Sequence, residues 1–136
     1  MFEILEHTAD IGIRAWGKTL AEHFENAALA VVSIAVEVDR VEPRIAYPIA
    51  ASGEDRESLL VNWLNEVVYY LDGRRVAMSR FQVEALTDTS VAGKGWGEPR
   101  EPERHPSKII VKAVTYHQLR VYQEQDRWIA EVYLDI

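Results

Sequence analysis

Two stretches of this 136-residue chain repeat their apolar residues at the spacing of an α-helix, while the segments around them alternate apolar and polar residues as strands do. The helical stretches are 19–36 and a second that starts near 52–55 and ends near 72–73. The strand patterns cover 2–7, 11–16, 45–51, 76–87, 108–114, 119–123 and 127–136. We therefore expect an α+β fold: a mixed, mainly antiparallel sheet of about six to seven strands, with both amphipathic helices packed on one face.

The expected helices carry recognisable start signals. Thr19 followed by Glu22 is a capping-box pattern, in which the two residues satisfy free amides of the first turn. Asp55 fits the first turn of the second helix, where the helix dipole favours negative charge. In this helix the apolar stripe faces the core, and the opposite side is expected to face solvent with Asn62, Asn65 and Glu66.

Residues 88–107 hold three glycines, three prolines and several charges. The segment is too long for an ordinary connection between elements, so we expect a loop that is either mobile or functional. Its Ala92–Glu98 run resembles a phosphate cradle, but it lacks the G-x-x-x-x-G-K-[ST] pattern and no helix signal follows. A flexible loop or strand edge, with Trp96 as a contact for a protein partner, is the better interpretation.

Composition limits the class of protein. The apolar content of 48 % supports one core, so we expect a single domain over 1–136. No segment approaches the length of a membrane span, no signal-peptide pattern is present, and the chain has no cysteine. The net charge of −7 repels phosphate backbones, so strong direct nucleic-acid binding is not expected. These features favour a soluble cytoplasmic protein without a membrane partner.

Carboxylates stand beside strands at both ends of the sequence. Asp10 separates the first two expected strands, and Asp135 directly precedes Ile136, which carries the free α-carboxylate. If the first and last strands are neighbours, Asp10, Asp135 and Ile136 form what we call the acidic corner, an oxygen-rich site suited to a hard divalent cation. An Asp between strands is more often a turn residue. Asp135 lies on the polar face of its strand, where plain solvent exposure is the alternative.

Several other polar residues have both a functional and an ordinary interpretation. Lys112 interrupts the apolar run of its strand, so it either faces solvent or approaches a carboxylate. His117 is a candidate base or metal ligand, but a lone histidine is more often a surface residue, and the same holds for His7. No HExxH motif and no Ser-His-Asp ordering stands out, so a zinc enzyme or serine hydrolase is poorly supported.

Five segments, in order along almost the whole chain, resemble the archease family. The similar segments are His7–Ile13, Phe24–Ala28, Leu60–Leu71 with its Trp63-Leu64-Asn65-Glu66 core, Lys112–His117 and the final Leu134-Asp135-Ile136. The 88–107 loop is the least diagnostic part of this resemblance.

The resemblance implies a protein cofactor rather than an enzyme. Archeases assist the RNA ligase that joins 3′-phosphate or 2′,3′-cyclic-phosphate ends to 5′-hydroxyl ends in tRNA splicing and RNA repair, promoting ligase guanylylation and repeated turnover. The family's metal ligands match Asp10, Asp135 and Ile136, and calcium is the ion usually assigned. As a hypothesis, Lys112 and His117 then contact phosphate or the ligase, while Asp55, Glu66 and His7 support the metal ligands or contact the partner.

Two other classes of function remain open. A chaperone or modulator of RNA-modifying enzymes, an older proposal for the family, predicts binding to several unrelated proteins. A metal-dependent phosphohydrolase predicts turnover without any ligase, although no second carboxylate–histidine cluster suggests a two-metal site.

Overall fold

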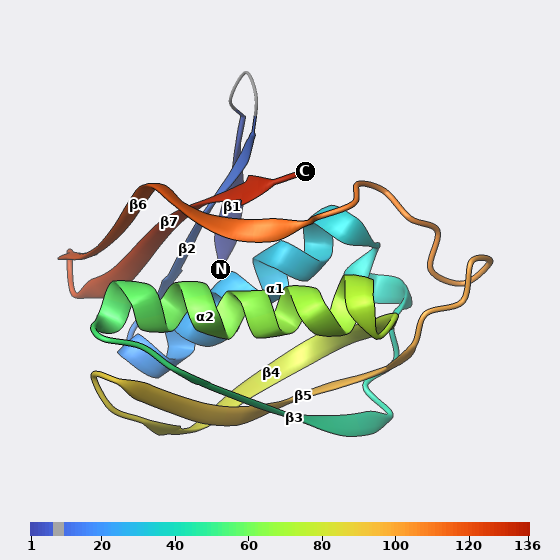
Figure 1. The fold of residues 1–136 in the computed structure, drawn as a ribbon, viewed down its shortest axis with the longest axis horizontal. Coiled ribbons are helices and arrows are strands. Elements are labelled where there is room, and N and C mark those ends of the chain that lie inside the picture. Colours follow the sequence, from blue (N-terminus) through green and yellow to red (C-terminus); the bar gives the residue numbers. More distant parts are fainter. Residues whose placement is uncertain (7–9) are drawn as a thin grey trace.

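The computed structural model describes residues 1–6 and 10–136, and within them it contains the expected two α-helices and seven β-strands (Figure 1). The helices are α1 (Leu20–Ala35) and α2 (Arg56–Val68), with a short 3-10 helix, η1 (Val38–Arg40), and a π-helical turn, η2 (Tyr69–Gly73). The strands are β1 (Phe2–Glu6), β2 (Ile11–Gly17), β3 (Ile45–Ser52), β4 (Val76–Leu86), β5 (Ser90–Pro99), β6 (Ala113–Glu124) and β7 (Arg127–Asp135).

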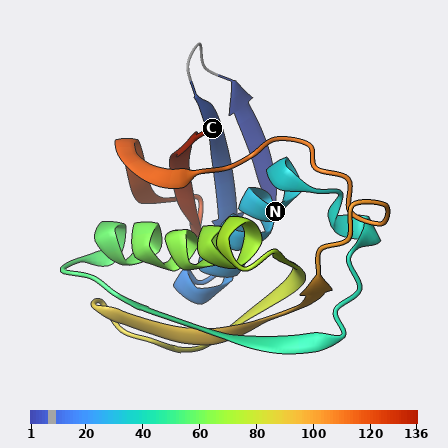
Figure 2. The same ribbon diagram turned by 45° about the vertical axis from the view of Figure 1, so that its right-hand side comes forward.

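The strands form two separate antiparallel sheets. A four-stranded sheet has the order β1-β2-β7-β6, and a three-stranded sheet has the order β3-β5-β4. The two helices lie side by side between these sheets, as both views show (Figures 1 and 2). The α+β class is therefore confirmed, but the expected single sheet with helices on one face is corrected to two sheets that enclose the helices.

The burial of α1 explains this arrangement. It contacts β2 of the larger sheet and β4 of the smaller one, whereas α2 contacts β6 and β3. The buried positions of α1 spread around the helix more widely than one amphipathic stripe: His23, Phe24, Ala27, Ala28, Ala30, Val31, Val32, Ile34 and Ala35. A helix with so broad an apolar surface needs a sheet on each side to bury it.

Local capping chemistry sets both helix starts, through Thr19 as expected and through Asp55 as the cap itself rather than as a first-turn residue. Thr19 accepts a hydrogen bond from the Glu22 amide at 3.0 Å and begins α1. Asp55 is the residue before α2, and its side chain accepts from the Ser58 amide at 2.8 Å while the Ser58 hydroxyl accepts from the Asp55 amide at 3.1 Å. No helix in the described residues has the length and apolar character that crossing a membrane requires.

The expected loop at 88–107 is wrong over its first half, because Ser90–Pro99 is β5, the central strand of the smaller sheet. Its glycines are buried and alternate with exposed Ala92 and Lys94 and with half-buried Trp96. A Cβ on Gly95 would lie 2.2 Å from the Met78 sulfur, and one on Gly97 would lie 1.8 Å from the Ala77 carbonyl oxygen. The glycines therefore permit close strand packing rather than a flexible loop.

The strand expected at 108–114 is corrected, whereas the one expected at 119–123 lies within a longer strand. Residues 108–112 are not in a strand, and β6 runs from Ala113 to Glu124. Its pairing with β7 is interrupted between Thr115 and Arg120, where Gln118 has a φ of 53°. β6 and β7 form a hairpin whose turn contains Gln125 and Asp126, both at positive φ.

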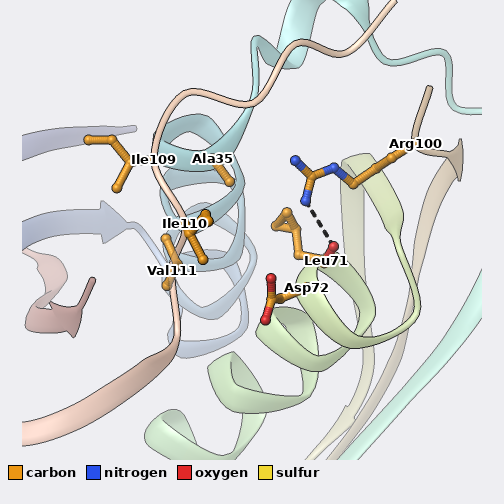
Figure 3. A pocket seen from close by; sticks show the side chains of 7 residues that line it. All are labelled: Ala35, Leu71, Asp72, Arg100, Ile109, Ile110 and Val111. Atoms are coloured by element: carbon orange, nitrogen blue, oxygen red, sulfur yellow. Dashed lines mark hydrogen bonds between the residues drawn. The ribbon is translucent and has the colours of Figure 1, made fainter. Parts of the chain in front are cut away.

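The connection between β5 and β6 is tied to the core at several points. Glu98, which is fully buried, accepts hydrogen bonds from Arg104 and His105 in the first part of the connection. Figure 3 shows two further contacts: Arg100, at the start of the connection, donates to the Leu71 carbonyl oxygen at 3.0 Å, and Ile109, Ile110 and Val111, near its end, lie along the end of α1 beside Ala35. This path leads the chain to β6 beside the C-terminus.

Candidate metal centre

The two ends of the chain meet in the larger sheet. β2 and β7 are antiparallel neighbours, and Ile11 pairs directly with Leu134. Continuing this register by one residue sets Asp10 opposite Asp135 at the edge where β2 begins and β7 ends. In Figures 1 and 2 the C-terminus accordingly lies beside the start of β2. The expectation that the first and last strands are neighbours is therefore corrected: β7 pairs with the second strand, β2, and β1 lies on the other side of β2.

β6 encloses Asp135 from the other side. Ala113 pairs with Asp135, and the Lys112 amide donates a hydrogen bond to the Asp135 carbonyl oxygen at 2.8 Å. The end of β7 is therefore held between β2 and β6 rather than left as a free terminus. Asp135 remains exposed and Ile136 is 39 % exposed, so their oxygen atoms are accessible from outside.

Alternation along β7 separates the acidic corner from the core. Val132 and Leu134 are fully buried, so Tyr133 and Asp135 project from the opposite face of the sheet. The Tyr133 ring crosses β2 at Gly12, where a Cβ would lie 2.8 Å from the ring's Cε1 atom. The His117 ring stands nearly edge-on to Tyr133, with 6.2 Å between the ring centroids. An aromatic pair thus adjoins the acidic corner on the outer face.

The chemistry of the donors fits a hard divalent cation. Asp10 and Asp135 supply carboxylate oxygens, and Ile136 supplies further oxygen atoms one residue beyond Asp135. Among residues 1–6 and 10–136 no group of three or more His, Cys, Asp or Glu side chains is placed to hold a metal. A metal here would therefore depend on oxygen atoms of Ile136 in addition to the two aspartates.

Of the other candidate residues, some lie near the acidic corner and others do not. Lys112 lies beside it and is exposed, and His117 lies farther along β6, also exposed. Glu66 is exposed on α2. Asp55 precedes α2, about 15 Å along the helix from Asn65, which bonds to Val114 of β6, so the structure does not bring Asp55 to the corner. His7 lies outside the described residues.

One residue next to the corner has a role that the sequence pattern did not reveal. Asn65, expected on the solvent face of α2, is only partly exposed and bonds to the backbone of β6 through both atoms of its amide. Its Oδ1 accepts from the Val114 N–H at 2.8 Å, and its Nδ2 donates to the Val114 carbonyl oxygen at 3.3 Å. In the sequence, Asn65 is only an amide side chain beside the apolar stripe of a helix, and this pattern does not indicate a bonding partner elsewhere in the chain.

The comparisons with known proteins all point to one family. Residues 2–136 match the family model described as "Archease protein family (MTH1598/TM1083)". The chain is 38 % identical over 136 residues to Protein archease of Sulfurisphaera tokodaii, covering 99 % of this chain and 98 % of that protein. It is 40 % identical over 139 residues to Protein archease of Methanosarcina acetivorans, covering 99 % and 95 %.

Two solved structures are similar as well. The solution structure of Methanobacterium thermoautotrophicum protein 1598 aligns with a TM-score of 0.82 at 33 % identity, covering 99 % of this chain and 98 % of that one. The crystal structure of an archease from Thermotoga maritima, described as a possible chaperone, aligns with a TM-score of 0.64 at 19 % identity, covering 97 % and 94 %. At that identity the second comparison supports the fold alone. The family match and the identity to curated relatives show that the chain belongs to the archease family.

Proposed function

We propose that this protein is a non-catalytic activator of the RNA ligase that joins 3′-phosphate or 2′,3′-cyclic-phosphate ends to 5′-hydroxyl ends. In this proposal it promotes guanylylation and repeated turnover of the ligase in tRNA splicing and RNA repair. Family membership supports the general role of a cofactor protein. The observation that supports the site is the pairing of Ile11 with Leu134, which sets Asp10 opposite Asp135 at an exposed edge of the fold.

We assign the proposed function to the acidic corner. Asp10, Asp135 and oxygen atoms of Ile136 would hold a divalent cation, with calcium as the expected ion. A divalent cation supplies positive charge that offsets the triphosphate during nucleotidyl transfer. The end of β7 is accessible yet fixed between β2 and β6, so it can enter a cleft on a partner without losing its shape. Exposed Lys112 adjoins this end and provides a positive group for a phosphate or an acidic residue of the ligase.

A ligation assay with excess broken RNA tests this function. Purified ligase alone is expected to stall after about one round, and adding the protein should give many rounds. Asp10→Asn and Asp135→Asn should fold normally but lose most of the stimulation. Asp126→Asn is the matched control, because Asp126 lies in the turn at the other end of β7. Full stimulation by both corner variants would refute the proposed site.

The same reagents separate the alternative functions. A general chaperone, the role suggested in the description of the Thermotoga maritima protein, would associate with several unrelated proteins and would not depend on the two aspartates. A phosphohydrolase would release product from an RNA phosphoester without ligase. A single ligase partner, recovered from cell lysate by the original protein but not by the corner variants, supports the activator.

A further inference from the structure

The first residues of β6 form an isolated paired segment beside the acidic corner. Pairing with β7 covers only Ala113, Val114 and Thr115 before the register is interrupted. On the other side, residues 100–112 belong to the connection from β5 and are not in a strand. Only these three residues of β6 therefore pair with the end of β7, and one of them, Ala113, pairs with Asp135; the pairing resumes at Arg120.

β6 is also the edge strand of its sheet, so among the described residues its second side has no strand partner. Asn65 of α2 covers this edge at Val114, accepting from its N–H at 2.8 Å and donating to its carbonyl oxygen at 3.3 Å. A side-chain amide with one donor and one acceptor makes here the same two-point contact that a neighbouring strand would make. The contact holds the paired segment from the side opposite β7.

This contact connects to the acidic corner in two short steps. Val114 is 4 % exposed and lies directly opposite Leu134, the residue before Asp135. Two residues before Val114, the Lys112 N–H donates to the Asp135 carbonyl oxygen at 2.8 Å. A displacement of Val114 therefore shifts the strand that aligns Asp135, and with it Ile136.

We propose that Asn65 is a positioning residue for the acidic corner: by fixing Val114 it holds the start of β6 against Asp135 and so sets the geometry in which the corner takes a divalent cation. This inference rests on the metal-binding part of the proposed function. Residues that orient metal ligands without touching the ion typically change metal affinity by about 10- to 100-fold when they are replaced.

Asn62 provides a matched control on the same helix. It lies three residues before Asn65 and donates from Nδ2 to the Ser52 carbonyl oxygen at 2.7 Å, at the end of β3 rather than on β6. Asn62→Ala and Asn65→Ala therefore each remove an asparagine that bonds to backbone. They differ in the strand that loses its side-chain contact, which is β3 in Asn62→Ala and β6 in Asn65→Ala.

Calcium titration by calorimetry, with Tm measured in parallel, decides between a positioning and a purely structural role. Asn65→Ala should raise the calcium dissociation constant at least about tenfold. Asn62→Ala should leave it within about twofold, whatever its effect on Tm. Equal calcium affinity in Asn65→Ala and the original protein would overturn the inference, as would equal weakening in both variants. An original protein that binds no calcium would instead overturn the proposed metal site on which the inference rests.

Hydrogen exchange gives a test that needs no variant and covers the case in which Asn65→Ala does not fold. Because binding and positioning are linked, calcium should slow exchange of the Lys112 and Val114 amides together. Slower exchange at Lys112 with no change at Val114 would contradict the coupling.

Discussion

Ile11 and Leu134 are direct partners across β2 and β7, so two residues 123 positions apart in sequence fix the meeting of the chain's ends. Leu134 is fully buried and its neighbour Asp135 is exposed, so one pair anchors the corner in the core and presents it to solvent. This arrangement gives the acidic corner a stable base, because shifting β7 by one residue would reverse the faces of all its side chains.

His23 should make the fold sensitive to mild acid. Its side chain is fully buried, and burial lowers the pKa of the imidazole from 6.5 to about 4, although the contact of Nδ1 with the Leu20 carbonyl acts the other way. Between those pH values the unfolded chain binds a proton that the folded chain does not. The free energy of unfolding should therefore be unaffected by this group above pH 6.5 and fall by about 3 kcal/mol as the pH drops to 4.

Urea unfolding at pH 7 and pH 4.5 measures this loss. His23→Leu should show a smaller drop between the two pH values than the original protein, even if its stability at pH 7 is lower. An equal drop in both proteins would show that His23 does not cause the sensitivity.

Glu98 should be the main charged contributor to stability in the smaller sheet. Its carboxylate accepts hydrogen bonds from the Glu42 amide, Arg44, Arg104 and His105. Burial favours the neutral acid, but these bonds and the charge of Arg104 outweigh it and lower the pKa of Glu98 from 4.5 to about 2. The stabilisation is therefore present above pH 4.5 and is lost as the pH falls toward 2.

Replacing Glu98 should leave the buried His105 and the Glu42 amide without an acceptor and separate Arg44 and Arg104 from their shared carboxylate. Glu98→Ala is expected to cost about 3 kcal/mol of unfolding free energy at pH 7, measured by urea denaturation. Glu84→Ala is the comparison, because Glu84 is exposed and its nitrogen–oxygen distance to Lys94 is 3.6 Å. That change should stay within about 0.5 kcal/mol. Similar costs for the two variants would contradict the role of Glu98.

Gly97 should tolerate no side chain. A Cβ there would lie 1.8 Å from the Ala77 carbonyl oxygen and 2.6 Å from the Met78 Cα, so strand β4 would have to move. Gly97→Ala is expected to lower the free energy of unfolding by about 2 kcal/mol or more. Ala92→Val, which adds bulk at an exposed position of the same strand, should be nearly neutral. Normal stability of Gly97→Ala would contradict the close packing of β4 on β5.

Asp55 should act as a helix cap rather than as part of the acidic corner. Hydrogen bonds from the backbone and side chain of Ser58 lower the pKa of the Asp55 carboxyl, as expected for a capping residue. Asp55→Ala should lower Tm, whereas Asp55→Ser should preserve it because serine also caps helices. Both variants should stimulate the ligase like the original protein in the multi-round assay. Lost stimulation by a stable Asp55→Ser protein would restore Asp55 as a contact residue.

The helix starts could be predicted because capping is local. Thr19 bonds to an amide three residues ahead, and Asp55 does the same, so both signals lie within four consecutive residues. Strand β5 could not be predicted from glycine content, since glycine marks both loops and tightly packed strands. Gly93, Gly95 and Gly97 recur at every second position, which is the period of a strand, but the reason for them, the closeness of β4, is a tertiary contact.

In the acidic corner, too, local features could be predicted from the sequence and tertiary contacts could not. Asp10 and Asp135 could be selected from the sequence because each is a carboxylate beside a strand pattern, and the pairing of β2 with β7 then brought the two strands together. Asn65 could not be selected, because its partner Val114 lies 49 positions away and any polar residue on a helix is usually solvated. The interruption of β6 after Thr115 likewise depends on pairing with β7, which no local pattern describes.

A crystal structure grown with calcium tests the central claim most directly. The account predicts one calcium ion at the acidic corner, bound by carboxylate oxygens of Asp10 and Asp135 and by an oxygen of Ile136, at the 2.3–2.6 Å typical of calcium. Calcium bound elsewhere, or a corner in which Asp10 lies away from Asp135 with no ion between them at saturating calcium, would contradict it.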